Sequence, residues 1–207
     1  MTTDRDTVQS YNDNAAQYAA EAAEMPKWVA AEIDRFVTNL GGEGRVLEIG
    51  SGGGRDALEL ESRGISVRRT DVAEGFVKLL RENGFEADLR DPLTDGLADP
   101  QRPGTPYDGV WACASLIHVA RQDLGTVLGR LAAVTKACGR LHVSVRDGDG
   151  DDVSTHGSGT TGQRYVETYW REPALRTVLT EAGWIVSAVC RYEGRPDDWW
   201  LSVRASR

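Results

Sequence analysis

A glycine-rich segment near residue 50 carries the clearest chemical signal in this chain. Residues 46–56 read V-L-E-I-G-S-G-G-G-R-D, so a short apolar run that contains Glu48 passes through a glycine loop into helix-like sequence. Glycine lacks a Cβ and tolerates left-handed torsions, which lets the backbone approach a ligand closely, and the free N–H groups of a helix start can hold an anionic group. Asp71 follows a second apolar stretch, where a carboxylate can accept hydrogen bonds from both hydroxyls of a ribose. The loop and Asp71 together predict a nucleoside-cofactor site.

Polar and aromatic side chains further along the chain are candidates for substrate contacts. His118 follows a predicted strand and could be a general base or a substrate contact, or equally a packed histidine at a helix start. Arg146 ends a later strand and could pair with an anionic substrate, or lie at the surface as an ordinary arginine. Tyr165, Tyr169 and Trp200 could form the wall of an aromatic pocket, although alternation along a strand lets only one tryptophan of the W-W pair face the inner side of a sheet.

We expect no metal site. The acidic run 147–152 resembles a calcium-binding loop, but Asp152 stands at position six, where glycine is needed, and Ser158 at position twelve, where glutamate is needed. The three cysteines share no metal-type spacing. His142 alternates with apolar residues in a predicted strand, which favours a structural role, and His156 lies in a Gly/Ser-rich stretch where a solvated histidine is the simpler interpretation.

Strand-like and helix-like segments alternate from residue 45 onward, which predicts an α/β fold with a mainly parallel sheet. The predicted strands are 45–49, 65–70, 85–88, 108–114, 140–145, 184–192 and 199–203. The predicted helices are 6–40 with a break near Met25–Pro26, 55–63, 74–83, a helix that begins after Asp123 and ends at Gly139, and 171–182. Residues 92–106 and 147–163 read as long loops, and loops of that length are usually functional or disordered.

The last two predicted strands are joined by G-R-P-D-D, which is too short for a helical crossover. They must therefore form an antiparallel hairpin. A mainly parallel sheet that ends in such a hairpin is unlike an ordinary dinucleotide-binding fold.

Composition limits the possible partners. A chain of 207 residues fits one domain with a sizeable core. Its net charge of −8 argues against an electrostatic grip on nucleic acid or an anionic membrane. No apolar run approaches the roughly 20 residues of a membrane span, the first residues lack the apolar core of a secretory signal, and the odd number of cysteines favours reduced thiols. We therefore expect a cytoplasmic protein, either a monomer or a homodimer.

With the glycine loop, Asp71 and the terminal hairpin in view, the chain resembles the class I S-adenosylmethionine (SAM)-dependent methyltransferases, in particular the small stand-alone bacterial type. The resemblance implies a Rossmann-like, seven-stranded sheet of order 3-2-1-4-5-7-6 with strand seven antiparallel and helices on both faces. It also implies an N-terminal helical cap over residues 1–40 that acts as a lid on a SAM-binding domain, residues 41–207.

The same resemblance assigns roles to individual residues. Those that would bind SAM are Tyr18 in the lid, Glu48, Gly50, Ser51, Gly52 and Gly54 in the loop, Asp71 and Val72 at the ribose, Asp88 and Leu89 at the adenine, and Ala112 and Ser115 after the fourth strand. The candidate catalytic residues are His118 and Tyr11. We expect the acceptor to lie between the lid, His118, Arg146 and the 147–163 loop, and the charge of Arg146 favours an anionic acceptor.

The predicted function is in-line transfer of the SAM methyl group to a small-molecule acceptor, with the acceptor atom left open among O, N, S and C. Three alternatives remain: a SAM-utilising cyclase or lyase, a non-catalytic SAM-binding protein, and an NAD-type oxidoreductase. The last is disfavoured because the G-x-G-x-x-G pattern would need glycine or alanine where Arg55 stands.

Overall fold

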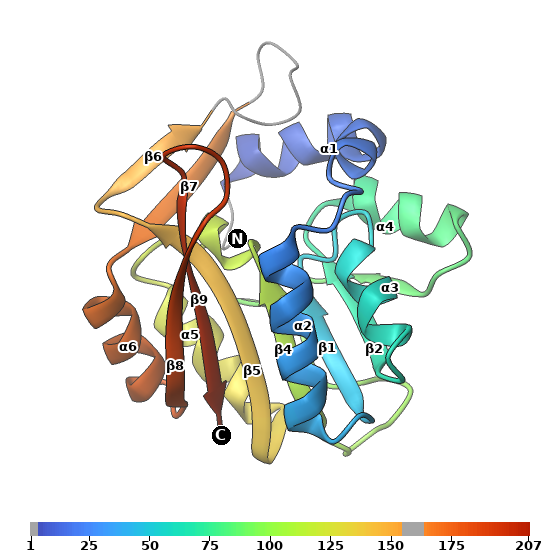
Figure 1. The fold of residues 1–207 in the computed structure, drawn as a ribbon. Coiled ribbons are helices and arrows are strands. Elements are labelled where there is room, and N and C mark those ends of the chain that lie inside the picture. Colours follow the sequence, from blue (N-terminus) through green and yellow to red (C-terminus); the bar gives the residue numbers. More distant parts are fainter. Residues whose placement is uncertain (1–3, 155–163) are drawn as a thin grey trace.

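A nine-stranded sheet organises the part of the chain that the computed structural model describes, residues 4–154 and 164–207 (Figure 1). The strands are β1 (Arg45–Ile49), β2 (Ser66–Asp71), β3 (Ala87–Leu89), β4 (Tyr107–Cys113), β5 (Thr135–Asp147), β6 (Asp151–Ser154), β7 (Tyr165–Trp170), β8 (Ile185–Glu193) and β9 (Trp199–Ser206). From β3 the order runs β3-β2-β1-β4-β5, and β5 then pairs with two different strands. Its middle pairs with β9, which pairs with β8, and its carboxyl end pairs with β7, which pairs with β6.

The predicted topology is confirmed once β6 and β7 are set aside. The remaining order is β3-β2-β1-β4-β5-β9-β8, which is the expected 3-2-1-4-5-7-6 arrangement. β9 runs antiparallel to both of its neighbours, as the short connection between the last two strands required.

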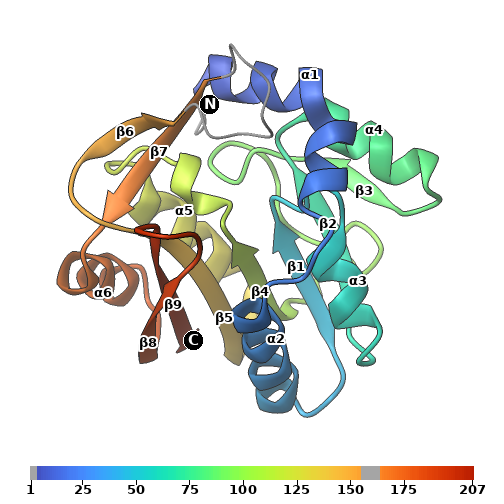
Figure 2. The same cartoon turned by 45° about the horizontal axis from the view of Figure 1, so that its top comes forward.

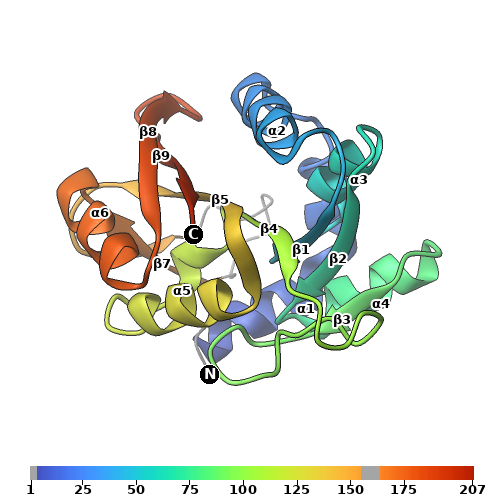
Figure 3. The same cartoon turned by 90° about the horizontal axis from the view of Figure 1, so that it is seen from below.

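Helices cover both faces of the sheet (Figure 3). The helices of the described chain are α1 (Arg5–Glu21), α2 (Lys27–Leu40), α3 (Arg55–Glu61), α4 (Glu74–Glu82), α5 (Leu124–Ala133) and α6 (Glu172–Glu181), together with one 3-10 turn, Leu116–His118. α2 and α3 bury apolar residues such as Ile33 and Leu60 against one face. α5 and α6 bury Leu128 and Leu179 against the other. The predicted break near Met25–Pro26 is present, and Pro26 stands immediately before α2, where its missing N–H costs no helical hydrogen bond.

The expectation of a structureless loop over residues 147–163 is wrong where the structure describes it. β5 continues to Asp147, and residues 151–154 pair with residues 165–168 of β7 in an antiparallel hairpin. The Gly- and Asp-rich composition suggested a loop, whereas backbone pairing with a distant segment makes part of it a strand. Residues 155–163, with His156 and Ser158, lie outside the described residues.

α1 lies across the edge of the sheet where β1, β2 and β4 end (Figure 2). Polar side chains hold it there: the N–H of Val166 donates to Thr7 Oγ1 at 2.9 Å, and the N–H of Gly75 donates to Asn12 Oδ1 at 2.9 Å. α2, in contrast, packs on the face of the sheet. Among the described helices none has the length and apolar character needed to cross a membrane.

Candidate active site

A cavity of about 450 Å³ opens beneath α1 at the carboxyl ends of β1, β2 and β4. In open α/β sheets this edge is where ligands bind. The predicted site residues that line it are Tyr11, Tyr18, Glu48, Gly50, Ser51, Gly52, Asp71, Val72, Ser115 and His118. The fold thus brings together residues from separate strands, loops and helices.

The glycine loop forms one wall of the cavity, with its backbone pressed against the segment that follows β4. A Cβ on Gly50 would lie 2.4 Å from the Cβ of Ser115, closer than two carbon atoms can approach. Gly52 has φ +52°, and a Cβ there would meet no described atom within 4 Å, so its side of the loop faces open space. Gly54 precedes α3, where a Cβ would lie 2.8 Å from Leu80 of α4. Gly50 and Gly54 therefore allow close packing, whereas Gly52 leaves the cavity free for a ligand.

Asp71 is fixed at the end of β2 by backbone donors. The N–H groups of Gly52 and Ala73 each donate to its carboxylate at 2.9 Å. Burial raises the pKa of Asp71 to about 6, while these hydrogen bonds act in the opposite direction. A carboxylate offers about four acceptor positions, so two hydroxyl groups of a ribose can still bind it.

Glu48 lies deeper, at the floor of the cavity. Its Oε2 is buried without a hydrogen-bond partner among the described residues. Burial, and then the nearby Asp56, raise the pKa of Glu48 to about 8. A buried carboxyl group with one unused oxygen suits a ligand that brings a positive charge or a hydrogen-bond donor.

His118 and Tyr11 form a hydrogen-bonded pair at the side of the cavity. His118 Nδ1 lies 2.8 Å from the carbonyl oxygen of Val166, and because a carbonyl only accepts, Nδ1 carries the hydrogen. Nε2 is then the acceptor in the neutral ring, and the Tyr11 hydroxyl donates to it at 2.8 Å. Burial lowers the pKa of His118 and raises that of Tyr11, so both groups are neutral near pH 7. The lone pair of Nε2 points toward α1.

Aromatic rings surround the ring of Tyr11. The centroid of the Tyr11 ring lies 4.7 Å from that of Tyr165, 5.4 Å from Tyr18 and 5.6 Å from Phe76. Tyr165 supports Tyr11 from β7, whereas Tyr18 and Phe76 line the cavity. Phe76, which reaches the site from the first turn of α4, was not predicted from the sequence.

Four residues predicted at the cofactor do not line the cavity in the described part of the chain: Gly54, Asp88, Leu89 and Ala112. Asp88 forms an ion pair with Arg68 at 2.8 Å, the side chain of Leu89 is exposed, and Ala112 lies in the apolar core. β3 ends one residue later than predicted, so the chain reaches the cavity at Arg90 and Pro92 instead.

Arg146, predicted to contact an anionic acceptor, is paired with other residues of the protein in this structure. Its Nε donates to Glu167 Oε2 at 3.1 Å, its Nη1 contacts Asp198, and its guanidinium lies 4.2 Å from the centre of the Trp200 ring. Two carboxylates therefore compensate the charge of one guanidinium, and a contact between Arg146 and an anionic acceptor stays a prediction. Tyr169 packs beside Gly148, and neither it nor Trp200 belongs to the described lining of the cavity.

The sheet order and the helices on both faces are those of the Rossmann-like methyltransferase fold. Comparison with known families agrees, because residues 46–139 match the family described as methyltransferase domain. The matched segment contains the glycine loop, Asp71 and His118. SAM is the cofactor of this family.

Individual relatives extend this result. The ubiquinone biosynthesis O-methyltransferase of Xylella fastidiosa is 32% identical over 104 residues, which cover 48% of this chain and 41% of that protein, so the alignment spans less than half of the relative's length. The structure is similar to 1,6-didemethyltoxoflavin-N1-methyltransferase of Burkholderia thailandensis, solved with S-adenosylhomocysteine and 1,6-didemethyltoxoflavin (TM-score 0.69, 24% identity, 97% of this chain and 84% of that chain). It is also similar to the cyclase SpnF (TM-score 0.60, 16% identity, 86% and 80%). At these identities the structural likeness establishes the fold alone.

Proposed function

We propose that the protein transfers the methyl group of SAM to a small-molecule acceptor that binds beside Tyr11 and His118. One observation carries the proposal: a single cavity contains both Gly52 and Asp71, which are suited to bind a nucleoside, and the neutral Tyr11–His118 pair. A binding protein needs only the first of these features. The second supplies a proton acceptor close to where a methyl acceptor would lie.

The residues present fit SAM. Asp71 would hold the ribose hydroxyls, the open side of Gly52 leaves room for the backbone to meet the ligand, and the unpartnered Oε2 of Glu48 would receive the ammonium group of the methionine part. When bound, SAM supplies a methyl group already activated on a sulfonium, so the protein mainly contributes proximity and alignment.

His118 would act on the acceptor rather than on SAM. The Val166 carbonyl keeps the hydrogen on Nδ1, so Nε2 is free to take a proton once an acceptor replaces the Tyr11 hydroxyl as its donor. As the bond between the acceptor and the methyl carbon forms and the bond between that carbon and sulfur breaks, the acceptor proton passes to Nε2. An acceptor with an O–H or N–H group suits this site best.

The aromatic lining supports a planar acceptor. Tyr18 and Phe76 line the cavity next to the Tyr11 hydroxyl, and aromatic rings pack well against flat ligands. Two relatives carry names in keeping with this class: one is an O-methyltransferase of ubiquinone biosynthesis, and the other was solved with 1,6-didemethyltoxoflavin.

The test measures S-adenosylhomocysteine formed from SAM in the presence of a panel of phenols, heteroaromatic N–H compounds and amines. Product with matched loss of the acceptor supports the proposal. Turnover of a metabolite without S-adenosylhomocysteine would instead indicate a cyclase or lyase, and tight binding of SAM without any turnover would indicate a binding protein.

We further infer that the protein works in the cytoplasm, as a monomer or homodimer, without nucleic acid. The free state of Cys113, Cys138 and Cys190 supports a reducing compartment, and the net charge of −8 disfavours polyanionic partners. The division into a cap of residues 1–40 and a domain of residues 41–207 also stays a prediction.

A further inference from the structure

A buried ion-pair cluster lies behind the Tyr11–His118 pair. Tyr165 and Glu167 are two positions apart on β7, so their side chains lie on the same face of the strand. Because Tyr165 packs 4.7 Å from Tyr11, that face is turned toward the candidate active site. The Glu167 carboxylate, only 8% exposed, therefore lies on the active-site side of β7.

Arg146 connects this carboxylate to two other elements. Its side chain, 15% exposed, comes from β5 and contacts Glu167 on β7, while Asp198, in the turn before β9, meets it from the other side. The guanidinium also lies over the ring of Trp200, which restricts its orientation. A side chain held by two carboxylates and a ring can fix the position of β7 relative to β5.

β7 in turn orients the imidazole. The carbonyl that accepts the Nδ1–H of His118 belongs to Val166, the residue directly before Glu167. A shift of Glu167 would move this carbonyl and with it the direction of the Nε2 lone pair. Arg146 thus acts on His118 by two routes, through the position of β7 and through the charge beside the ring.

We propose that Arg146 is a positioning residue for His118: by holding Glu167 it fixes the strand that orients the imidazole and balances the negative charge next to it. The role assigned to His118 rests on the proposed function, but the linkage between Arg146 and His118 is a property of the protein that can be measured without SAM or acceptor.

The groups that face His118 come from several elements: Tyr11 from α1, Tyr165 and Glu167 from β7, and Arg146 from β5. Burial is the largest influence and lowers the pKa of His118, the Val166 carbonyl and Glu167 raise it, and Arg146 lowers it. Removing the charge of Arg146 should therefore raise the pKa of His118, and removing the charge of Glu167 should lower it.

The experiment is an NMR titration of the histidine rings in the full-length protein. The chain contains three histidines, so the His118 resonance can be assigned by its loss in His118→Gln. We expect an upward shift of the His118 pKa in Arg146→Gln, a downward shift in Glu167→Gln, and a value close to wild type in the double variant. Arg146→Lys keeps the charge but cannot bridge two carboxylates as a guanidinium does, so it separates the electrostatic part from the positional part.

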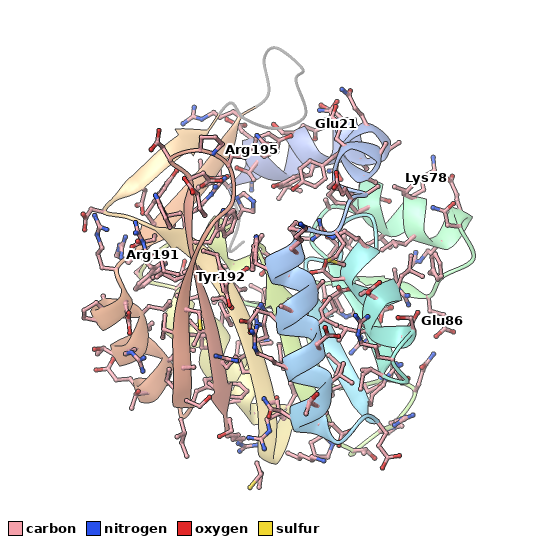
Figure 4. The ribbon with its side chains drawn as sticks, in the orientation of Figure 1. Glu21, Lys78, Glu86, Arg191, Tyr192 and Arg195 are labelled. Carbon is pink, nitrogen blue, oxygen red and sulfur yellow. The ribbon has the colours of Figure 1, made fainter. Side chains whose placement is uncertain are left out.

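Arg191→Gln is the matched control. Arg191, labelled in Figure 4, also pairs with a carboxylate, Asp147, and lies 3.9 Å from the centre of a tryptophan ring, Trp199, but on the exposed side of the hairpin. It should leave the His118 titration unchanged. Equal His118 pKa values in wild type, Arg146→Gln and Glu167→Gln would overturn the proposal. If Arg146→Gln fails to fold, the His118 pKa in Glu167→Gln decides whether the proposal holds. A wild-type protein that does not bind S-adenosylhomocysteine would refute the proposed function, but it would not change the measured linkage between Arg146 and His118.

Discussion

At the scale of single residues, the site combines groups whose ordinary ionisation has been altered by burial. Glu48 and Asp71 are carboxyl groups with raised pKa values, and His118 and Tyr11 form a neutral pair. The sequence identified each of these residues singly, from its place after a strand or in the lid. It could not show that the Tyr11 hydroxyl donates to His118, because the two lie 107 positions apart.

Asp71 provides the first test. We expect Asp71→Ala to weaken S-adenosylhomocysteine binding strongly in calorimetry, because each hydrogen bond to a charged group contributes about 1.5–3 kcal/mol. Asp99→Asn is the control: Asp99 is also buried and pairs with Arg45 at 2.8 Å, but it does not line this cavity. That variant should lose stability and keep its affinity. An unchanged affinity of Asp71→Ala for S-adenosylhomocysteine would show that Asp71 does not contact the ligand.

His118 and Tyr11 should respond differently to substitution. His118→Gln removes the proton acceptor and should lower kcat by roughly 10²–10⁴-fold, the usual contribution of a general base, without changing S-adenosylhomocysteine affinity. Tyr11→Phe leaves Nε2 in place and removes only the donor that an acceptor must displace, so kcat should change far less. The comparison is made by initial rates with the acceptor found in the panel assay. A full loss of activity in Tyr11→Phe with an active His118→Gln would reverse the two roles.

At the scale of elements, α1 and β7 complete the site although neither belongs to the central strands. The lid was predicted from Tyr11 and Tyr18, which are seven positions apart and therefore share a helix face. The hairpin of β6 and β7 was missed. Its signal was weak, because only the alternating segment Y-V-E-T-Y-W resembles a strand, and its partner is rich in Asp and Gly.

The contact between α1 and α4 tests the importance of the lid position. A Cβ on Gly75 would lie 2.8 Å from the carbonyl oxygen of Asn12, so Gly75→Ala must push α1 away from α4. We expect faster dissociation of S-adenosylhomocysteine and greater amide hydrogen exchange in α1. Gly129→Ala is the matched control: Gly129 lies inside α5, and a Cβ there meets no described atom within 4 Å. It should stabilise the protein by about 0.5–1 kcal/mol and leave dissociation unchanged. Identical dissociation rates in the two variants would show that the position of α1 does not control the ligand.

At the scale of the whole molecule, the strands and the terminal hairpin were predictable from local patterns, whereas the order of the strands was predicted from the resemblance to the methyltransferases. Apolar runs mark the strands, and the short connection before Trp199 forces an antiparallel hairpin. The ion pairs that complete the site depend instead on the folded chain. Arg146 contacts Glu167 and Asp198, which are 21 and 52 positions away in the sequence. The local sequence around these residues does not indicate the contact. The contacts between α2 and the β8–β9 hairpin also join residues that are far apart in the sequence. One example is Tyr192, whose hydroxyl donates to Glu32 at 2.8 Å (Figure 4).

The buried carboxyl groups make the stability of the whole protein depend on pH. The pKa of Glu48 rises from an ordinary 4.5 to about 8 on folding, so between these values the folded state binds a proton that the unfolded state has released. The free energy of unfolding must then fall as pH rises, by at most about 1.4 kcal/mol per pH unit. Below about pH 7.5 the histidines act in the opposite direction, because the unfolded chain binds protons on them, whereas burial lowers the pKa of His118 and brings that of His142 to about 3. Asp71, with a pKa of about 6, still loses its proton up to about pH 7 and acts in the same direction as Glu48.

The difference between wild type and Glu48→Gln from pH 6.5 to 8 isolates Glu48, because the histidines and Asp71 are the same in both proteins. Urea unfolding should show that the stability of wild type falls relative to that of Glu48→Gln as pH rises across this interval, by at most about 1.4 kcal/mol per pH unit, because the glutamine side chain keeps the shape of Glu48 without a titrating proton. Glu61→Gln is a suitable control, because Glu61 forms an ion pair with Arg69 at 2.6 Å outside the cavity. It should change the absolute stability and preserve the slope. Equal slopes in wild type and Glu48→Gln would show that Glu48 is already ionised in the free protein, and its unused oxygen would then face an ammonium group as a full negative charge.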